Sequence, residues 1–336
     1  MKSLKGRSFL TLKDYSSEEI LALLQLSIDL KAKKKGKAVA AKLEGKLLAG
    51  KNIVLIFDKS STRTRCSFEV AAFDEGAQVT FLTNSQMGKK ESIEDTAKVL
   101  GRLYDGIEYR GFSPQIIREI ALHAAVPVYN GLTDDDHPTQ VLADVMTAME
   151  HTGKAPHALK FAYIGDGRNN VSNALMIGAA KLGMEYRIAA PKELFPSKQL
   201  LDELAPAAQA SGAKISFTTD PVEAVKGVDV IYTDVWVSMG EEDKTEERIA
   251  LLKDYQVTMD LLKASGNDAV LFEHCLPSFH DLHTSVAQQI HEQFGLTELE
   301  VTDEVFRSKH SVVFDEAENR MHTIKAVMVA TLADIL

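Results

Sequence analysis

Short apolar runs alternate with longer segments of helical spacing along most of this chain. The short runs predict β-strands, and the longer segments predict helices. This alternation is typical of parallel sheets whose faces are covered by helices. We expect strands over residues 52–57, 78–82, 106–109, 126–129, 159–164, 185–189, 214–217, 228–233, 269–272 and 311–314.

Helix signals are clearest near the N-terminus. Ser16 and Glu19 form a capping box ahead of an apolar-periodic segment that ends near Lys35. Pro138 suits the first turn of a helix, so His137 is expected beside a helix start. Further helices are predicted over residues 62–76, 93–103, 113–125, 139–151 and 318–335.

The predicted strands fall into two series, separated by the polar segment 153–158. A chain of 336 residues is long enough for about two domains with separate cores. The sequence therefore predicts two doubly wound parallel-sheet α/β domains, residues 1–150 with the C-terminal helix 318–336, and residues 151–317. Polar motifs follow strands of both series, and ligands bind at the carboxyl ends of such strands. We therefore expect the active site in the cleft between the domains.

The composition of 45% hydrophobic and 26% charged residues is that of an ordinary globular protein. A net charge of −10 argues against a nucleic-acid-binding surface. Two cysteines, Cys66 and Cys275, provide no disulfide framework. Neither a signal peptide nor a run of about 20 apolar residues is visible. We expect a cytoplasmic protein without nucleic-acid or membrane partners.

The segment Ser61-Thr62-Arg63-Thr64-Arg65 follows the first predicted strand and opens a helix. The backbone N–H groups of a first helical turn favour anions, and arginine and hydroxyl side chains add donors. A capped helix with solvated arginines is the plainer alternative. So many donors in one loop favour a phosphate site.

Two further motifs of the first domain carry candidate donors. Arg110 directly follows a strand, so it is either a third guanidinium of the anion site or a surface arginine. His137 and Gln140 lie three residues apart on one helical face. They can enter one pocket and bind a carbonyl or an amide, or they can form only a polar helix start.

In the second domain, Gly165-Asp166-Gly167-Arg168-Asn169-Asn170 lies between a strand and a helix. It partly matches a dinucleotide-binding fingerprint, but Asn170 replaces the third glycine and no acidic residue ends the next strand. A nicotinamide-dependent dehydrogenase is therefore the alternative from another enzyme class. The asparagine pair also suits a zwitterionic substrate.

Asp234 begins the segment DVWVSMG at a strand end, where a carboxylate can pair with a substrate ammonium or cap a helix. His274 and Cys275 offer a nucleophile, metal ligands or buried packing. His280 and His283 belong to a polar loop and provide no second ligand pair at sensible spacing. The sequence therefore predicts no metal site.

Taken together, STRTR, YRGF, HPTQ, DVWVSMG, HCLP and ENRMHT resemble the aspartate/ornithine carbamoyltransferase superfamily, and within it the ornithine carbamoyltransferases. The resemblance covers nearly the whole chain, with the motifs in the family's order. It implies transfer of a carbamoyl group from carbamoyl phosphate to the δ-amine of L-ornithine, giving L-citrulline and phosphate, or the reverse reaction in arginine catabolism. No cofactor and no metal are implied.

The resemblance also assigns residues. It implies Arg63, Arg110, His137 and Cys275 as catalytic residues, with Cys275 positioning rather than acylated. The implied carbamoyl phosphate ligands are Ser61, Thr62, Arg63, Thr64, Gln86, Arg110, His137, Gln140, Cys275, Leu276 and Arg320, and the implied ornithine ligands are Asn170, Asp234, Ser238 and Met239. Gln86 resembles a residue that reaches a neighbouring subunit, which implies a homotrimer or a multiple of trimers.

Some positions depart from the family pattern. Lys89 stands where His is common, Asp136 where an aromatic residue is usual, Glu273 where Leu is usual, and Asp58 where Glu is more frequent. These changes bear on the pH optimum and leave the reaction class unchanged. Putrescine or acetylornithine as the acceptor, and a non-catalytic relative, remain alternatives.

Overall fold

A computed structural model describes residues 3–83, 85–237 and 240–336. The chain forms two compact units: unit 1 contains residues 1–146 and 318–336, and unit 2 contains residues 147–317. The boundaries fall within helix α5 (Pro138–Thr152) and helix α13 (Val313–Leu332). In the part of the chain described, no helix is long and apolar enough to cross a membrane.

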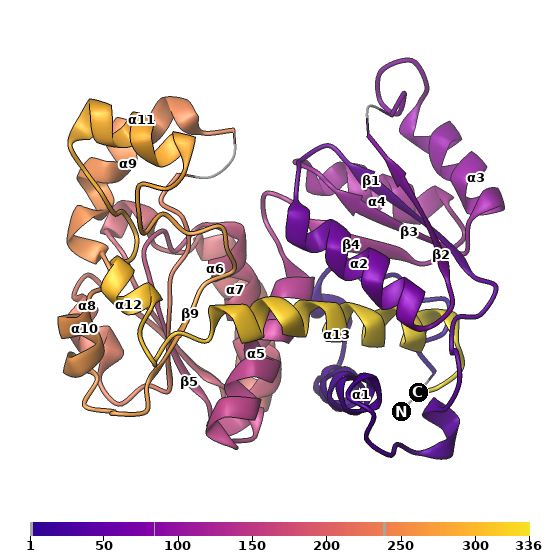
Figure 1. Cartoon of the computed structure of the whole chain (residues 1–336), viewed down its shortest axis with the longest axis horizontal. Coiled ribbons are helices and arrows are strands. Elements are labelled where there is room, and N and C mark those ends of the chain that lie inside the picture. The colour runs from indigo at the N-terminus through magenta and orange to yellow at the C-terminus, as the bar shows by residue number, and fades with distance from the viewer. Residues whose placement is uncertain (1–2, 84, 238–239) are drawn as a thin grey trace. The chain divides into compact units, whose positions relative to one another are not determined.

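Unit 1 is built on a parallel sheet with the strand order β2-β1-β3-β4 in its described residues. Helices α3 and α4 pack together on one face, whereas α2 lies on the other (Figure 1). The order reverses between β1 and β3, so the loops after these two strands meet at a switch point. The elements are α1 (Ser17–Lys34), β1 (Asn52–Phe57), α2 (Thr62–Asp74), β2 (Gln78–Leu82), α3 (Ile93–Leu103), β3 (Gly106–Arg110), α4 (Pro114–His123) and β4 (Val128–Leu132).

Strand β3 separates the core of unit 1 from its polar site. Ile107 and Tyr109 belong to a buried apolar cluster with residues of α3 and α4. Because successive side chains of a strand point to opposite faces, Glu108 and Arg110 lie on the face that carries α2. The alternation therefore places a buried acid and a buried arginine next to the phosphate-binding loop.

Unit 2 contains a second parallel sheet, with the order β7-β6-β5-β8-β9 among the described residues. Its switch point lies between β5 and β8. The elements are β5 (Lys160–Ile164), α6 (Asn170–Leu182), β6 (Glu185–Ala189), α7 (Lys198–Ser211), β7 (Lys214–Thr218), α8 (Pro221–Val225), β8 (Val230–Tyr232), α9 (Thr245–Leu252), α10 (Met259–Ala264), β9 (Leu271–Glu273), α11 (Ser285–Phe294) and α12 (Asp303–Phe306).

The predicted class of two parallel-sheet α/β domains is confirmed. The capping box at Ser16 and the helix start at Pro138 are also confirmed. The strand predicted over residues 311–314 is wrong, because Val313 begins α13 and Ser311 makes only an isolated bridge to Phe272. The cleft between the domains remains a prediction.

Gly131 on β4 is expected not to tolerate a side chain. A Cβ atom at this position would lie 1.8 Å from Oε1 of Glu108 and 3.3 Å from Cβ of Arg110. Glu108 is fully buried, so its carboxyl has little room to move. Gly131→Ala should destabilise unit 1 by about 1–3 kcal/mol, measurable by denaturant unfolding.

A double-mutant cycle provides the control for this prediction. In a Glu108→Ala background the clash with Oε1 disappears, so adding Gly131→Ala should cost much less. An equal cost in both backgrounds would contradict the steric explanation.

Candidate active site

Helix α2 starts in the loop that follows β1, and its first turn carries the candidate anion ligands. Ser61 is the N-cap, and its hydroxyl accepts a hydrogen bond from the backbone N–H of Thr64 at 3.2 Å. Other N–H groups of the first turn have no acceptor within the helix and lie at the positive end of its dipole. This turn is therefore suited to an anion.

The hydroxyl of Thr64 joins two arginines that are distant in the sequence. Its oxygen accepts hydrogen bonds from Nη2 of Arg320 on α13 at 2.9 Å and from Nη1 of Arg110 at the end of β3 at 3.3 Å. Arg110 is 6% exposed and Arg320 2% exposed. Guanidinium groups make strong, charge-assisted hydrogen bonds to phosphate and carboxylate oxygens. The position of these two groups beside the first turn of α2 therefore favours an anionic ligand.

His137 lies in the electric field of the arginines. Burial lowers the pKa of His137, and the positive charges of Arg320, Arg110 and Arg63 lower it further, well below its usual value. Nδ1 of His137 lies 3.5 Å from the hydroxyl of Thr139. A neutral imidazole has one donor and one acceptor nitrogen, so His137 can donate to a carbonyl oxygen without adding charge.

Residues of α5 that the sequence analysis did not assign hold this group together. Nε2 of Gln140 donates to Oδ1 of Asp144 at 2.8 Å, and the hydroxyl of Thr139 accepts from Nη2 of Arg320 at 3.4 Å. The four-residue spacing from Gln140 to Asp144 in the sequence could have predicted this contact on one helical face. These contacts fix the direction of the Gln140 amide and of the Arg320 guanidinium.

Glu108 is a third residue that the sequence analysis did not assign. It is fully buried behind Arg110. Burial raises the pKa of Glu108 well above its usual value, although the charges of Arg110 and Arg320 oppose the shift. The shift favours the protonated form of Glu108. In the sequence, an acidic residue within a buried strand could have indicated a functional role for Glu108.

The structure brings Ser61, Thr64, Arg110, His137, Gln140 and Arg320 into one group, which we call the first half-site together with Thr62 and Arg63. Arg65 is engaged elsewhere. Its Nε lies 2.9 Å from Oε1 of Glu69, and its guanidinium lies 3.8 Å from the ring centre of Phe81. Gln86 is exposed in the loop between β2 and α3.

Asp136 is a buried acid immediately before His137. Burial and the charge of Asp135 raise the pKa of Asp136 to about 7, while Thr11 and Lys13 oppose the shift. Between pH 4 and pH 7 the unfolded chain ionises this group but the folded chain does not, so stability falls as the pH rises. Asp136→Asn should therefore raise the thermal midpoint at pH 8 more than at pH 5. The corresponding gain in the free energy of unfolding should not exceed about 4 kcal/mol.

The exposed neighbour Asp135 provides the matched control for this prediction. Asp135→Asn should produce a clearly smaller pH-dependent gain in the same calorimetric scans, because it removes the charge of Asp135 but leaves Asp136 buried. Equal midpoints of Asp136→Asn and the wild-type chain at both pH values would contradict a buried, shifted Asp136.

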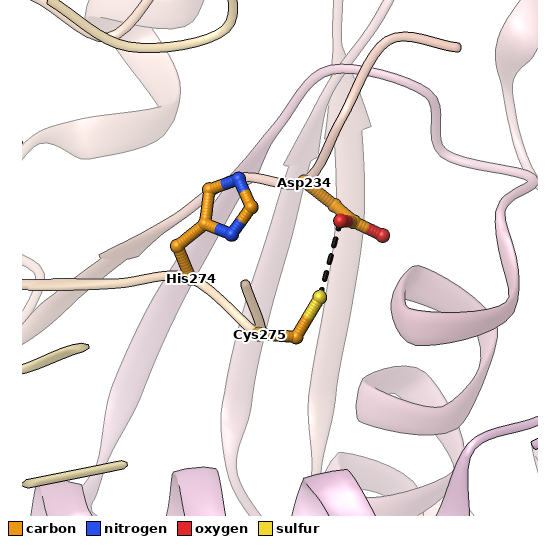
Figure 2. Close-up of side chains that lie close together, drawn as sticks. All are labelled: Asp234, His274 and Cys275. Carbon is orange, nitrogen blue, oxygen red and sulfur yellow. Dashed lines mark hydrogen bonds between the residues drawn. The ribbon is translucent and has the colours of Figure 1, made fainter. Parts of the chain in front are cut away.

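In unit 2, Asp234 is the centre of a polar cluster at the end of β8. Figure 2 shows the thiol of Cys275 pointing at Asp234, with Sγ donating to Oδ1 at 3.1 Å. Oδ1 also accepts from the backbone N–H of Val235 at 2.8 Å, and Oδ2 accepts from Nδ2 of Asn169 at 2.6 Å. A thiol that donates to a carboxylate carries its proton, so the geometry favours a positioning role for Cys275.

Asn169 makes a contact with Asp234. Asn169 is the N-cap of α6, and its side-chain oxygen accepts from the backbone N–H of Ser172 at 2.8 Å. Asn170 is the first residue of the helix and is half-buried. The preceding Asp166 is held at 2.8 Å by Arg248. The sequence indicated the asparagine pair, but the resemblance assigned a ligand role only to Asn170 and left the contact of Asn169 unpredicted.

The segment after β9 is fixed by His274 and Glu300, both fully buried. Nδ1 of His274 accepts from the backbone N–H of Leu276 at 2.9 Å, so its proton lies on Nε2, 3.3 Å from Oε1 of Glu300. The same oxygen accepts from the backbone N–H of Phe279. Glu300 was not identified from the sequence, because it is distant along the chain.

We call Asn169, Asn170, Asp234, Cys275 and Leu276 the second half-site. Ligand atoms of Asp234, His274 and Cys275 lie within 4.8 Å of one another, which is close enough for a metal ion. Asp234 already accepts hydrogen bonds from Asn169 and Val235, and His274 already accepts one from the backbone of Leu276. The predicted residues Ser238 and Met239 lie outside the described residues.

Comparisons with known proteins agree along the whole chain. The carbamoyl-phosphate-binding domain of the aspartate/ornithine carbamoyltransferases matches residues 7–150, and their aspartate/ornithine-binding domain matches residues 157–331. The chain is 61% identical over 335 residues to the catabolic ornithine carbamoyltransferase of Bacillus licheniformis, covering 99% of this chain and 98% of that protein. An ornithine carbamoyltransferase of Limosilactobacillus reuteri is equally similar, at 61% identity with the same coverage. The solved ornithine carbamoyltransferase of Pyrococcus furiosus has a TM-score of 0.87 and 40% identity, covering 99% of both chains.

Proposed function

Because the chain belongs to the aspartate/ornithine carbamoyltransferase family, we propose that it transfers the carbamoyl group of carbamoyl phosphate to the δ-amine of L-ornithine. The products are L-citrulline and phosphate, and the same residues serve the reverse reaction. The observation that carries the proposal is the buried contact of Arg110 and Arg320 with Thr64 at the start of α2. Thr64 and Arg110 lie in the part of the chain that matches the carbamoyl-phosphate-binding domain.

The first half-site binds carbamoyl phosphate in this proposal. The first turn of α2, together with Arg63, Arg110 and Arg320, takes the phosphate oxygens. The neutral His137 donates to the carbamoyl oxygen, which becomes more negative as the amine adds to the carbonyl carbon. These donors therefore stabilise the tetrahedral intermediate and the departing phosphate more than the bound substrate.

The second half-site binds ornithine in this proposal. Asp234 pairs with a substrate ammonium group, and Asn170, Ser238 and Met239 complete the ornithine ligands. Cys275 and Leu276 lie beside the carbamoyl group, with the Cys275 thiol directed by its hydrogen bond to Asp234. The δ-amine attacks in its neutral form, so no covalent enzyme intermediate is required.

A panel of acceptor amines tests the activity. The chain is incubated with carbamoyl phosphate and, separately, with ornithine, putrescine, acetylornithine or aspartate, and the ureido product of each is measured. We expect citrulline from ornithine as the main product. Product with putrescine but not ornithine would overturn the ornithine assignment and retain the carbamoyltransferase class.

We also propose that the chain assembles as a homotrimer or a multiple of trimers. Large apolar side chains are exposed on helices of unit 1, including Phe73 on α2 at 76%, Leu103 on α3 at 65% and Leu122 on α4 at 76%. Exposed apolar side chains of this size suit contacts with other subunits. Light scattering tests the mass, with Phe73→Asp expected to weaken assembly, and a monomeric wild-type chain would overturn this proposal.

A further inference from the structure

Histidine and aspartate side chains gather in unit 2 between the loop after β9 and the start of α12. Nδ1 of His280 lies 2.7 Å from Oδ1 of Asp303 and 3.7 Å from Oδ2 of Asp281. Nδ1 of His283 lies 3.0 Å from the same oxygen of Asp281. We call these four residues the His280 cluster. One ligand atom from each of His280, Asp281 and Asp303 lies within 4.8 Å of the other two.

The donor set of the His280 cluster indicates a class of ligand. One imidazole nitrogen with two carboxylates, beside a second imidazole held on Asp281, suits divalent transition metals, whereas Ca²⁺ and Mg²⁺ prefer oxygen alone. The ring of His280 is already oriented, because it stacks on Phe306 with 3.6 Å between ring centres and 9° between planes. A ligand held in place before binding loses less freedom when the metal arrives.

A cation already lies against both carboxylates. Nε of Arg307 is 2.8 Å and 2.9 Å from the two oxygens of Asp303, and its Nη2 is 3.2 Å from Oδ2 of Asp281. The two carboxylates therefore already hold one positive group.

We propose that the His280 cluster binds one divalent transition-metal ion of the Zn²⁺, Co²⁺ and Ni²⁺ class. His280, Asp281 and Asp303 are its ligands, and His283 holds the ligand Asp281 through its contact at 3.0 Å. The ion takes the place of the Arg307 guanidinium, whose side chain is 57% exposed and can turn into solvent. This site is separate from the carbamoyl-transfer chemistry and does not depend on the proposed function.

The metal would join the loop of residues 274–284 to α12. The same loop begins with His274 and carries Cys275 of the second half-site. A bond between His280 and Asp303 through the ion would slow local opening of this loop. Amide hydrogen exchange of the loop should therefore slow when metal is added.

Cobalt titration of the full chain tests the site without substrates, because Co²⁺ in a four- or five-coordinate nitrogen and oxygen site absorbs visible light much more strongly than the hydrated ion. The wild-type chain should develop this band with one equivalent of ion. His280→Gln and His283→Gln should each weaken binding at least about 10-fold. The side chain of His283 is 85% exposed, so its replacement leaves the fold intact even where His280→Gln does not.

Two control variants distinguish Co²⁺ bound at the His280 cluster from Co²⁺ bound elsewhere on the chain. His291→Gln removes an exposed histidine on α11 and should bind Co²⁺ like the wild type. Cys275→Ser removes the sulfur ligand of the cluster around Asp234, and should also leave the signal unchanged. Arg307→Gln should tighten binding by removing the competing cation.

Three outcomes would overturn the proposal. One is a wild-type chain that shows no Co²⁺ band at the equivalence point. The second is a signal that persists in both His280→Gln and His283→Gln. The third is a signal lost in Cys275→Ser, which would assign the ion to the cluster around Asp234.

Discussion

Arg110→Ala is expected to lower kcat about 10²–10³-fold, the typical effect of removing one donor to charge that develops in the transition state, here on the departing phosphate. The guanidinium of Arg110 is buried at the end of β3 and touches the hydroxyl of Thr64 in the first turn of α2. The measurement is initial-rate citrulline formation at saturating ornithine and carbamoyl phosphate.

Arg65 provides the matched control from the same sequence motif. Its guanidinium pairs with Glu69 and stacks on Phe81, so Arg65→Ala should leave turnover within a few-fold of the wild type. Near-normal turnover of Arg110→Ala, or an equal loss in both variants, would contradict the role assigned to Arg110.

Asp234→Asn is the second large effect that we expect. It retains the shape of the side chain but removes the charge that faces the substrate ammonium in the proposed function. Hydrogen bonds to charged groups contribute about 1.5–3 kcal/mol, so kcat/KM for ornithine should fall about 10- to 100-fold. The loss should appear mainly in KM, because ground-state binding is affected.

Asp229 is a matched control because it lies just before β8, whereas Asp234 lies just after it. The two residues are 5% and 7% exposed, and Asp229 pairs with Lys154 at 2.6 Å. Asp229→Asn should lower thermal stability without changing KM for ornithine. An unchanged KM in Asp234→Asn would remove this carboxylate from the ornithine ligands.

The sequence predicted those parts of the fold that depend on local patterns. Strand Asn52–Phe57 and the capping box at Ser16 follow from apolar periodicity and from contacts within one helical turn. The apolar run at residues 311–314 misled the prediction, because a short run of this kind fits a strand or a buried helix start. Here Val313 is buried as the first residue of α13.

Local sequence patterns could not predict contacts between segments that are distant along the chain. Thr64 was assigned from its motif, but its bond to Arg320 joins positions 256 residues apart. Similarly, His280 and His283 gave no predicted metal site, because the carboxylate of Asp303 comes from a separate helix. Such groupings arise from tertiary packing, which the spacing along the chain does not encode.

The central claim is that the two half-sites divide the substrates between them. Calorimetric titration with inorganic phosphate, one product of the reaction, tests it most directly in Arg110→Ala and Asp234→Asn side by side. The account predicts phosphate affinity at least about 10-fold weaker in Arg110→Ala and within about twofold of the wild type in Asp234→Asn. Equal weakening in the two variants, or weakening in Asp234→Asn alone, would contradict it.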